Sequence, residues 1–155
     1  LDADSAPTRE LFEATAREIE RGDRVFVGAV VRLDADLGWS GNALLGLWNL
    51  ASRCLRWMAG SFVAVDATAF RAVGGFDQAL YAGEELDLSR RLKAFGRRDG
   101  RTYTILTRHP ILSSARRLKL YRRTELLRFF AQATLRPFHT PRSKEACAMW
   151  YDGKR

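Results

Sequence analysis

The sequence predicts an α/β fold in which a mixed sheet is flanked by helices, and three observations support this. The chain has 155 residues, of which 46% are hydrophobic and 11% aromatic, enough to build a globular core. Residues 24–33 (RVFVGAVVRL) form a nearly unbroken apolar run that is typical of a strand buried on both faces. Strand-like segments alternate along the chain with segments whose apolar residues recur at helical spacing.

Two helices are predicted around this strand. Leu1 to Ser5 are expected to form the last residues of a buried strand that runs into a turn. A helix then starts near Pro7 and ends at Gly22-Asp23, with four residues at helical spacing: Leu11, Phe12, Thr15 and Ile19. Residues 38–42 are expected to form a turn, and residues 43–58 a long second helix.

Four further elements are predicted before the end of the sheet. They are a strand, a short helix, a longer helix and a strand, over residues 61–65, 68–73, 85–95 and 102–107. Asp66 is expected to cap the short helix and Gly74-Gly75 to end it. Gly96 is expected to end the longer helix.

The net charge of +8 is concentrated near one end of the chain. Residues 1–100 carry 13 Lys and Arg against 15 Asp and Glu, whereas residues 101–155 carry 13 against 3. From Ser113 onward, basic residues accompany a Leu and Phe stripe, which predicts a basic amphipathic helix. We therefore divide the chain into residues 1–112 and a basic tail, 113–155, that packs on the domain or lies on an anionic membrane surface. Nucleic-acid binding is disfavoured, because aromatic or glycine-rich recognition elements do not interleave with the charges.

The cysteine spacing and the hydropathy of the chain indicate its cellular location. Cys54 and Cys147 lack the spacing of a zinc site or a disulfide framework, which indicates reduced thiols in a cytoplasmic protein. The longest uncharged apolar run, residues 43–52, is shorter than the ~20 residues of a membrane-spanning helix. We expect a cytoplasmic chain, with peripheral attachment to the inner face of the membrane as the alternative. Because it begins at Leu1 rather than Met, we also expect it to be part of a longer gene product.

Two carboxylates near the start form the first candidate site. Asp2 and Asp4 lie two residues apart, so on an extended segment both project to one side at the carboxyl end of a strand. Mg²⁺ or Mn²⁺ held by one or two carboxylates completes its shell with water and substrate phosphate, which indicates a nucleotide diphosphate. A surface pair without function is the alternative. The second copy of the motif, Asp34 and Asp36, leads into a glycine-containing segment that is interpreted as a solvated turn.

A series of motifs gives a more specific indication. In order, the chain shows LDADS at 1–5, G-S-F-x-x-V at 60–65, F-R-A-V-G-G-F-D at 70–77 and G-E-E-L-D-L-S-R-R-L-K-A-F-G at 83–96. This order is similar to the second half of family 2 glycosyltransferases, over about residues 1–100. The resemblance implies a GT-A fold whose amino-terminal, nucleotide-binding half is missing here. It also implies metal-dependent transfer of a sugar, with inversion, from a nucleotide-sugar donor to a hydroxyl acceptor that is lipid-linked or a small molecule.

The resemblance assigns roles to the acidic residues. It implies that Asp4 ligates the metal on the donor diphosphate while Asp2 lies towards the nucleotide. It places the general base on Glu85, but family members usually show Glu-Asp at this pair, so Glu84 stays the alternative. Judged without the motif order, Glu84 and Glu85 are simply acidic residues that are favourable at a helix start.

Further residues are candidates for substrate contact. The resemblance places Gly74-Gly75 at the border of the acceptor pocket, with Phe76 or Trp57 as a platform for sugar stacking. Helix termination by the glycines and core packing of the aromatics are the alternatives. Arg116-Arg117 follows the last strand, where the two arginines reach a phosphate of donor or acceptor or form a solvated basic face.

Two other functions stay open. A phosphatase of the haloacid dehalogenase type also places Asp-x-Asp at a strand end, but that pattern expects Thr or Val where this chain has Ala6. The 155 residues are also consistent with a non-catalytic fragment, because the resemblance implies that the half that would hold the nucleotide base and ribose is missing.

Overall fold

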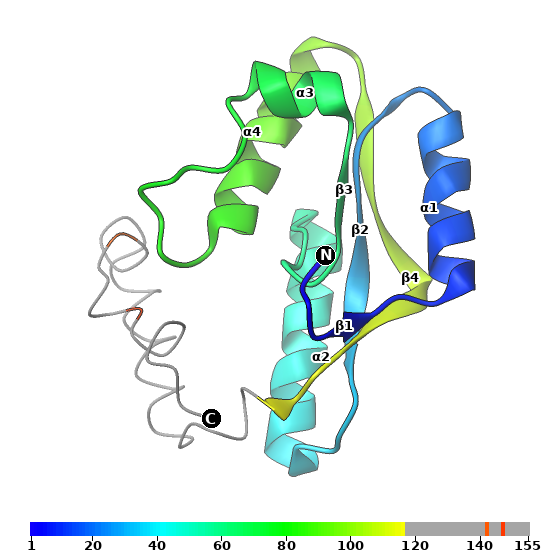
Figure 1. Cartoon of the computed structure of the whole chain (residues 1–155), viewed down its shortest axis with the longest axis vertical. Coiled ribbons are helices and arrows are strands. Elements are labelled where there is room, and N and C mark those ends of the chain that lie inside the picture. The colour runs from blue at the N-terminus through cyan, green and yellow to red at the C-terminus, as the bar shows by residue number, and fades with distance from the viewer. Residues whose placement is uncertain (117–141, 143–146, 148–155) are drawn as a thin grey trace.

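The computed structural model describes residues 1–116, Arg142 and Cys147, so most of the predicted tail, Arg117 included, lies outside the described residues. Strands and helices alternate along the described part up to its third helix, which a further helix follows before the last strand (Figure 1). In chain order they are β1 (Ser5–Ala6), α1 (Arg9–Glu20), β2 (Arg24–Leu33), α2 (Gly38–Leu55), β3 (Val63–Val65), α3 (Ala67–Ala72), α4 (Glu84–Arg98) and β4 (Thr102–Ser113).

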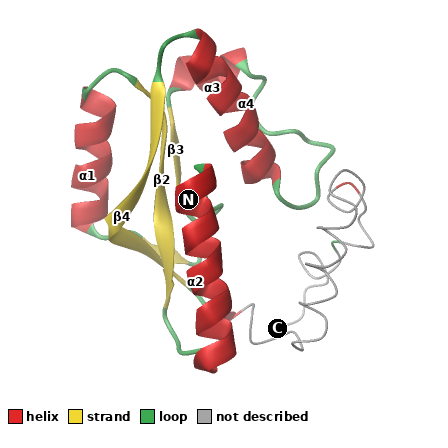
Figure 2. Ribbon diagram, turned by 180° about the vertical axis from the view of Figure 1, so that it is seen from behind, coloured by secondary structure: helices red, strands yellow, loops and turns green. Residues whose placement is uncertain are grey.

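The strands of the described part form one mixed sheet in the order β1-β4-β2-β3. β2 and β4 are parallel neighbours from Arg24↔Thr102 to Leu33↔Ser113. β1 pairs antiparallel with β4, and β3 pairs antiparallel with β2. α1 lies on one side of the sheet, and α2, α3 and α4 lie on the other (Figures 1 and 2). The predicted α/β class, with a mixed sheet flanked by helices, is confirmed at this level.

The first helix and the longest predicted strand follow the sequence closely. The Thr8 hydroxyl accepts a hydrogen bond from the Leu11 N–H at 3.2 Å, so Thr8 caps α1. Leu11 and Thr15 are buried as their spacing predicts, whereas Phe12 and Ile19 are exposed. β2 spans the predicted residues and buries most of its side chains, because helices cover both faces of the sheet.

The second helix begins and ends earlier than predicted. Residues 38–42, which were expected to form a separate turn, belong to the first turns of α2. The Asp36 carboxylate holds this helix start, because it accepts hydrogen bonds from the Gly38 N–H and the Asn42 side-chain amide, both at 2.8 Å. At the other end, Arg56 adopts a left-handed conformation with φ of 54°, so α2 stops at Leu55. The solvated turn predicted for the second Asp-x-Asp is therefore a helix start.

Gly96 does not end the longer helix as predicted. α4 runs through it to Arg98, and Gly100 follows with φ of 66°. A Cβ atom at Gly96 would lie 2.9 Å from Cγ2 of Val25 and 3.0 Å from the carbonyl oxygen of Arg101. Glycine is required here because the helix packs directly against β2 and the start of β4, which the linear sequence does not reveal.

The last strand is twice as long as predicted because it accommodates a bulge. Leu106 pairs with Ala29 and Ile111 pairs with Val31, so four residues of β4 face a single residue of β2. Pro110 lies within this irregular stretch, where a missing N–H costs no regular ladder bond. The strand then resumes and carries Ser113 next to the amino-terminal segment.

One hydrophobic core lies between the sheet and the α3–α4 pair. Its buried members are Val25, Phe26, Met58, Ala69, Leu88, Leu92 and Ile105. This packing fixes the first turn of α4 relative to the segment before β3. Among the described helices, none combines the length and the apolar character needed to cross a bilayer.

Candidate active site

A pocket of about 510 Å³ opens between the amino-terminal segment, the segment before β3, α3 and the start of α4. Its lining comprises Leu1, Asp2, Gly60, Val63, Val65, Ala67, Phe70, Arg71, Phe76, Glu84 and Glu85. Four residues predicted from the sequence thus meet here: Asp2, Phe76, Glu84 and Glu85. Asp2 lies more than 70 residues before the other three, which lie in or just after the loop between α3 and α4, so only the folded chain brings Asp2 to them.

The amino-terminal segment reaches the pocket as a turn, and not as the strand end that was predicted. The Ser5 N–H donates to the carbonyl oxygen of Asp2 at 3.1 Å, which closes a turn over Asp2 to Ser5. The strand, β1, follows this turn and pairs with β4. The carbonyl oxygen of Asp4 accepts from the Ser114 N–H at 3.1 Å, which holds the turn against the end of β4. Asp2 lines the pocket, whereas Asp4 is exposed outside its lining.

Glu85 is held at the first turn of α4 by contacts on two sides. Gly83 precedes the helix in a left-handed conformation with φ of 71°. The Ser89 hydroxyl donates to the carbonyl oxygen of Glu85 at 2.7 Å and accepts from the Met58 N–H at 3.0 Å. A Cβ atom at Gly60 would lie 3.7 Å from the carboxyl carbon of Glu85. The carboxyl group therefore rests against a backbone that has no side chain to shield it.

The environment of Glu85 changes its acidity. The pKa of Glu85 is raised to about 7, mainly by burial; the negative charges of Glu84 and Asp2 act in the same direction, and backbone hydrogen bonding opposes them. A carboxyl group with a pKa near neutrality exchanges a proton readily at physiological pH. Such perturbed groups in pockets are characteristic of catalytic acids and bases, although ion-pair networks also produce them.

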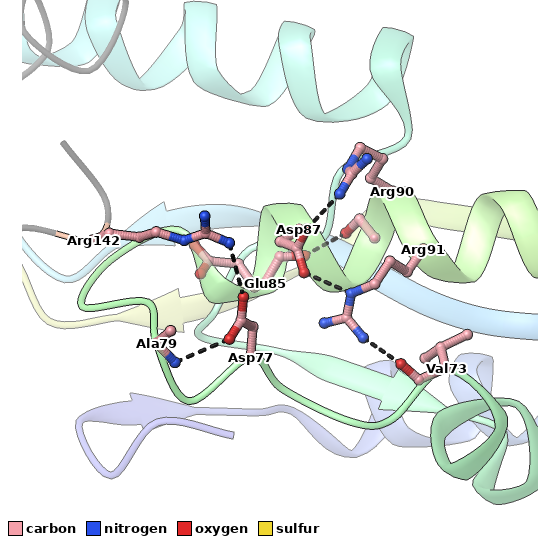
Figure 3. Close-up of polar contacts among 9 residues, drawn as sticks. Val73, Asp77, Ala79, Glu85, Asp87, Arg90, Arg91 and Arg142 are labelled. Carbon is pink, nitrogen blue, oxygen red and sulfur yellow. Dashed lines mark hydrogen bonds and ion pairs between the residues drawn. The ribbon is translucent and has the colours of Figure 1, made fainter. Parts of the chain in front are cut away.

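Asp87 has a structural role, because it pairs with two arginines that lie three and four residues further along α4. Its carboxylate accepts from Arg90 at 2.9 Å and from Arg91 at 2.6 Å, and Arg91 also donates to the carbonyl oxygen of Val73 at 2.6 Å (Figure 3). Although burial acts to raise the pKa of Asp87, these hydrogen bonds hold it below its ordinary value. The Asp87–Arg91–Val73 chain ties α4 to the end of α3.

The loop between α3 and α4 has an anchor of its own. The Asp77 carboxylate accepts from the Ala79 N–H at 3.0 Å and pairs with Arg142 at 3.4 Å (Figure 3). This ion pair is half exposed, so its contribution to stability is small. It brings one residue of the predicted tail to the loop that borders the pocket.

The two Asp-x-Asp pairs differ in whether their carboxylates are free to bind a metal ion. Among the described residues, no three His, Cys, Asp or Glu side chains converge on one point. Asp36 is engaged in the start of α2, and Asp34 accepts from the Ala115 N–H at 2.8 Å. Asp2 and Asp4 are exposed, and two carboxylates with substrate phosphate and water are a set that Mg²⁺ commonly uses.

Other predicted residues lie apart from the pocket lining. Gly74-Gly75 ends α3, with φ of 81° and 68°, which confirms the helix-termination interpretation. Trp57 is partly buried in the segment before β3, where its carbonyl oxygen accepts from the Ser52 hydroxyl at 2.6 Å. Arg116 is exposed, and its N–H donates to the Ser114 hydroxyl at 3.2 Å.

Sequence reasoning missed one charged residue of the site. Arg71 lines the pocket from the last turn of α3, opposite the acidic residues in sign. It is part of the F-R-A-V-G-G-F-D motif, next to Phe70, which also lines the pocket. Its position in that motif could have identified it. In addition, Arg71 lies four residues after Ala67 on α3, and both residues line the pocket.

Comparisons of the chain with protein-family models, with curated proteins and with solved structures gave no match. The chemistry of the pocket is therefore the guide to function.

Proposed function

We propose that this chain is the metal- and acceptor-side half of a GT-A glycosyltransferase of the family 2 type, with Glu85 as its general base. The protein that carries the chain transfers a sugar from a nucleotide-diphosphate donor to a hydroxyl acceptor. One observation supports this most strongly: the Glu85 carboxyl lies in a pocket with Asp2, and its pKa is raised to about 7. The order of the four motifs adds to this support.

The task proposed for Glu85 is proton transfer. The acceptor oxygen forms a bond to the anomeric carbon while its proton passes to the Glu85 carboxylate. On the opposite side, the bond from the anomeric carbon to the diphosphate oxygen breaks, and the nucleoside diphosphate leaves with the electron pair. Attack from the face opposite the leaving group inverts the anomeric configuration.

The lining of the pocket suits a sugar acceptor. Phe70 and Phe76 contact each other edge to face with ring centroids 5.7 Å apart, and both line the pocket. Aromatic faces pack well on the C–H faces of sugar rings. Arg71 supplies a positive charge that pairs with phosphate on the donor or on the acceptor.

The proposal includes a divalent cation. Asp2 and Asp4 are the carboxylates that would hold Mg²⁺ or Mn²⁺ together with the donor diphosphate. When bound, the cation supplies positive charge that stabilises the leaving diphosphate.

Release of nucleoside diphosphate is the direct test. The protein that carries this chain is incubated with Mn²⁺, a set of uridine, guanosine and thymidine diphosphate sugars and simple hydroxyl acceptors. We expect release of nucleoside diphosphate from at least one donor. In Glu85→Gln, release should fall by ~10²-fold or more, because the amide keeps the shape of the side chain but accepts no proton.

Glu84→Gln is the matched control, because it removes the neighbouring carboxylate and leaves Glu85 in place. Donor affinity, measured by calorimetry, should stay near that of the unmodified protein in both variants. A severe loss confined to Glu84→Gln would move the base by one residue. Equal, near-normal release in both variants, or no release from any donor, would overturn the proposal.

A further inference from the structure

One face of α2 is apolar and exposed. The side chain of Asn49 hydrogen-bonds both the N–H and the carbonyl oxygen of Val31, at 2.9 and 2.8 Å, so this side of the helix faces β2. The opposite side carries a stripe at helical spacing, which we call the outer face of α2: Trp39, Ala43, Leu47, Leu50 and Cys54. Trp39 is 85% exposed, Leu47 64% and Leu50 53%.

This exposure is unusual for side chains of this kind. A surface helix of a globular protein normally turns apolar residues inward and polar residues outward. α2 has apolar residues on both sides, because Leu45 and Trp48 pack inward against a second buried cluster, which comprises Leu11, Ala29, Val31, Ala59, Phe62 and Ile111. Contiguous exposed apolar surface marks a site of interaction with another molecule or with a membrane.

The charges around the outer face identify the kind of partner. α2 itself contains no Asp or Glu, and Arg53 and Arg56 lie at its carboxyl end. The Asp36 carboxylate just before its amino end is engaged by Gly38 and Asn42. Lys93 from α4 joins the two arginines, because its ammonium group donates to the carbonyl oxygen of Leu55 at 2.6 Å. The apolar stripe is therefore bordered at one end by three cations from two helices.

We propose that the outer face of α2 docks on an anionic lipid surface. In this arrangement Leu47 and Leu50 enter the boundary between headgroups and acyl chains, and Trp39 lies at headgroup level, where indole rings are favoured. Arg53, Arg56 and Lys93 then contact the lipid phosphates. α2 lies in the plane of the membrane and does not cross it.

The proposed surface consists of residues of α2 with Arg56 and Lys93, and it includes no residue of the basic tail. It is also separate from the pocket, because no residue of α2 lines it. Docking through α2 would hold the protein at the membrane whether or not Glu85 is a catalytic base, so the two proposals are independent.

Co-sedimentation with vesicles tests the proposal in the intact chain, with its tail retained. The vesicles contain equal parts of phosphatidylglycerol and phosphatidylcholine, and phosphatidylcholine alone serves for comparison. The double variant Leu47→Gln/Leu50→Gln should bind the anionic vesicles about tenfold or more weakly, because two leucine side chains no longer enter the apolar region. Arg53→Gln/Arg56→Gln should also lower binding, and more so at low salt.

Ile19→Gln is the matched control, because Ile19 on α1 is 53% exposed, the same fraction as Leu50. It should bind vesicles as the unmodified chain does. A second measurement locates the contact: an environment-sensitive fluorophore on the exposed Cys54 should shift its emission to the blue on addition of anionic vesicles.

Three outcomes would overturn the proposal. Vesicle binding that is unchanged in the double leucine variant would exclude the outer face of α2. Equal binding to neutral vesicles would exclude the role of the three cations. A fall in molecular mass of the double leucine variant in sedimentation equilibrium, with vesicle binding intact, would identify the face as a contact between two copies of the chain.

Discussion

The hydroxyl of Ser89 joins the first turn of α4 to the segment before β3. It accepts from the Met58 N–H at 3.0 Å and donates to the carbonyl oxygen of Glu85 at 2.7 Å, and Ser89 is fully buried. Because Gly60 lies two residues beyond Met58, this hydroxyl, together with core packing, links the turn that carries Glu85 to the segment that carries the glycine beside its carboxyl group.

Ser89→Ala should destabilise the fold. The substitution leaves the Met58 N–H buried without its partner, which costs about 1–3 kcal/mol. Urea unfolding followed by circular dichroism measures the loss. Ser40→Ala, in the first turn of α2, is the comparison and should change the free energy of unfolding by less than about 0.5 kcal/mol. Equal effects of the two substitutions would show that the Ser89 bridge contributes little.

The stability of the folded chain should depend on pH through Glu85. Its pKa is about 7 in the folded state, against an ordinary value of 4.5. Between these values the folded state keeps a proton that the unfolded state has lost, so the free energy of unfolding falls as pH rises. The slope from this group is at most about 1.4 kcal/mol per pH unit.

In Glu85→Gln this fall should be absent, and above pH 7 the variant should be more stable than the unmodified chain. Urea unfolding at intervals from pH 5 to pH 8 measures both slopes. Glu84→Gln should keep most of the slope, because it leaves the titrating group in place. Parallel slopes in the unmodified chain and Glu85→Gln would mean that the pKa of Glu85 is ordinary.

Gly60→Ala should lower the rate of sugar transfer without disrupting the fold. The new methyl group would lie 3.7 Å from the carboxyl carbon of Glu85, an ordinary contact, so the fold should tolerate it. It would nevertheless occupy the space through which an acceptor hydroxyl approaches Glu85, so transfer should fall about tenfold. The added burial should also raise the pKa of Glu85, which shifts the rising limb of the pH–rate profile to higher pH.

Gly46→Ala is the control for this substitution, because a Cβ atom there has no neighbour within 4 Å. It should leave transfer unchanged. Full activity of Gly60→Ala with an unshifted pH profile would show that the acceptor does not approach from this side.

Transfer should require Mg²⁺ or Mn²⁺ bound through the amino-terminal turn. Asp4→Ala should abolish transfer, and a chelator should do the same to the unmodified protein. Asp36→Ala should leave transfer largely intact, because the Asp36 carboxylate is engaged by Gly38 and Asn42 at the start of α2. Equal loss from both substitutions, or full activity with chelator, would disprove the assignment.

Local signals in the sequence determined much of the secondary structure. The apolar run of β2, the capping threonine before α1 and Asp66 before α3 act within a few residues, so their effects are visible in the linear chain. The same holds for Gly74-Gly75, since positive φ is a local property of the backbone. The acidic pair at the start of α4 could also be singled out, from its place in a series of motifs.

Contacts between distant segments decided the rest. Gly96 lies inside a helix because Val25 and Arg101 leave no room for a side chain, which its neighbours in sequence do not reveal. Asp2 and Arg71 meet Glu85 in one pocket only after the sheet has brought three segments together. The raised pKa of Glu85 has the same origin, because burial and nearby charge depend on the positions of residues far apart in the chain.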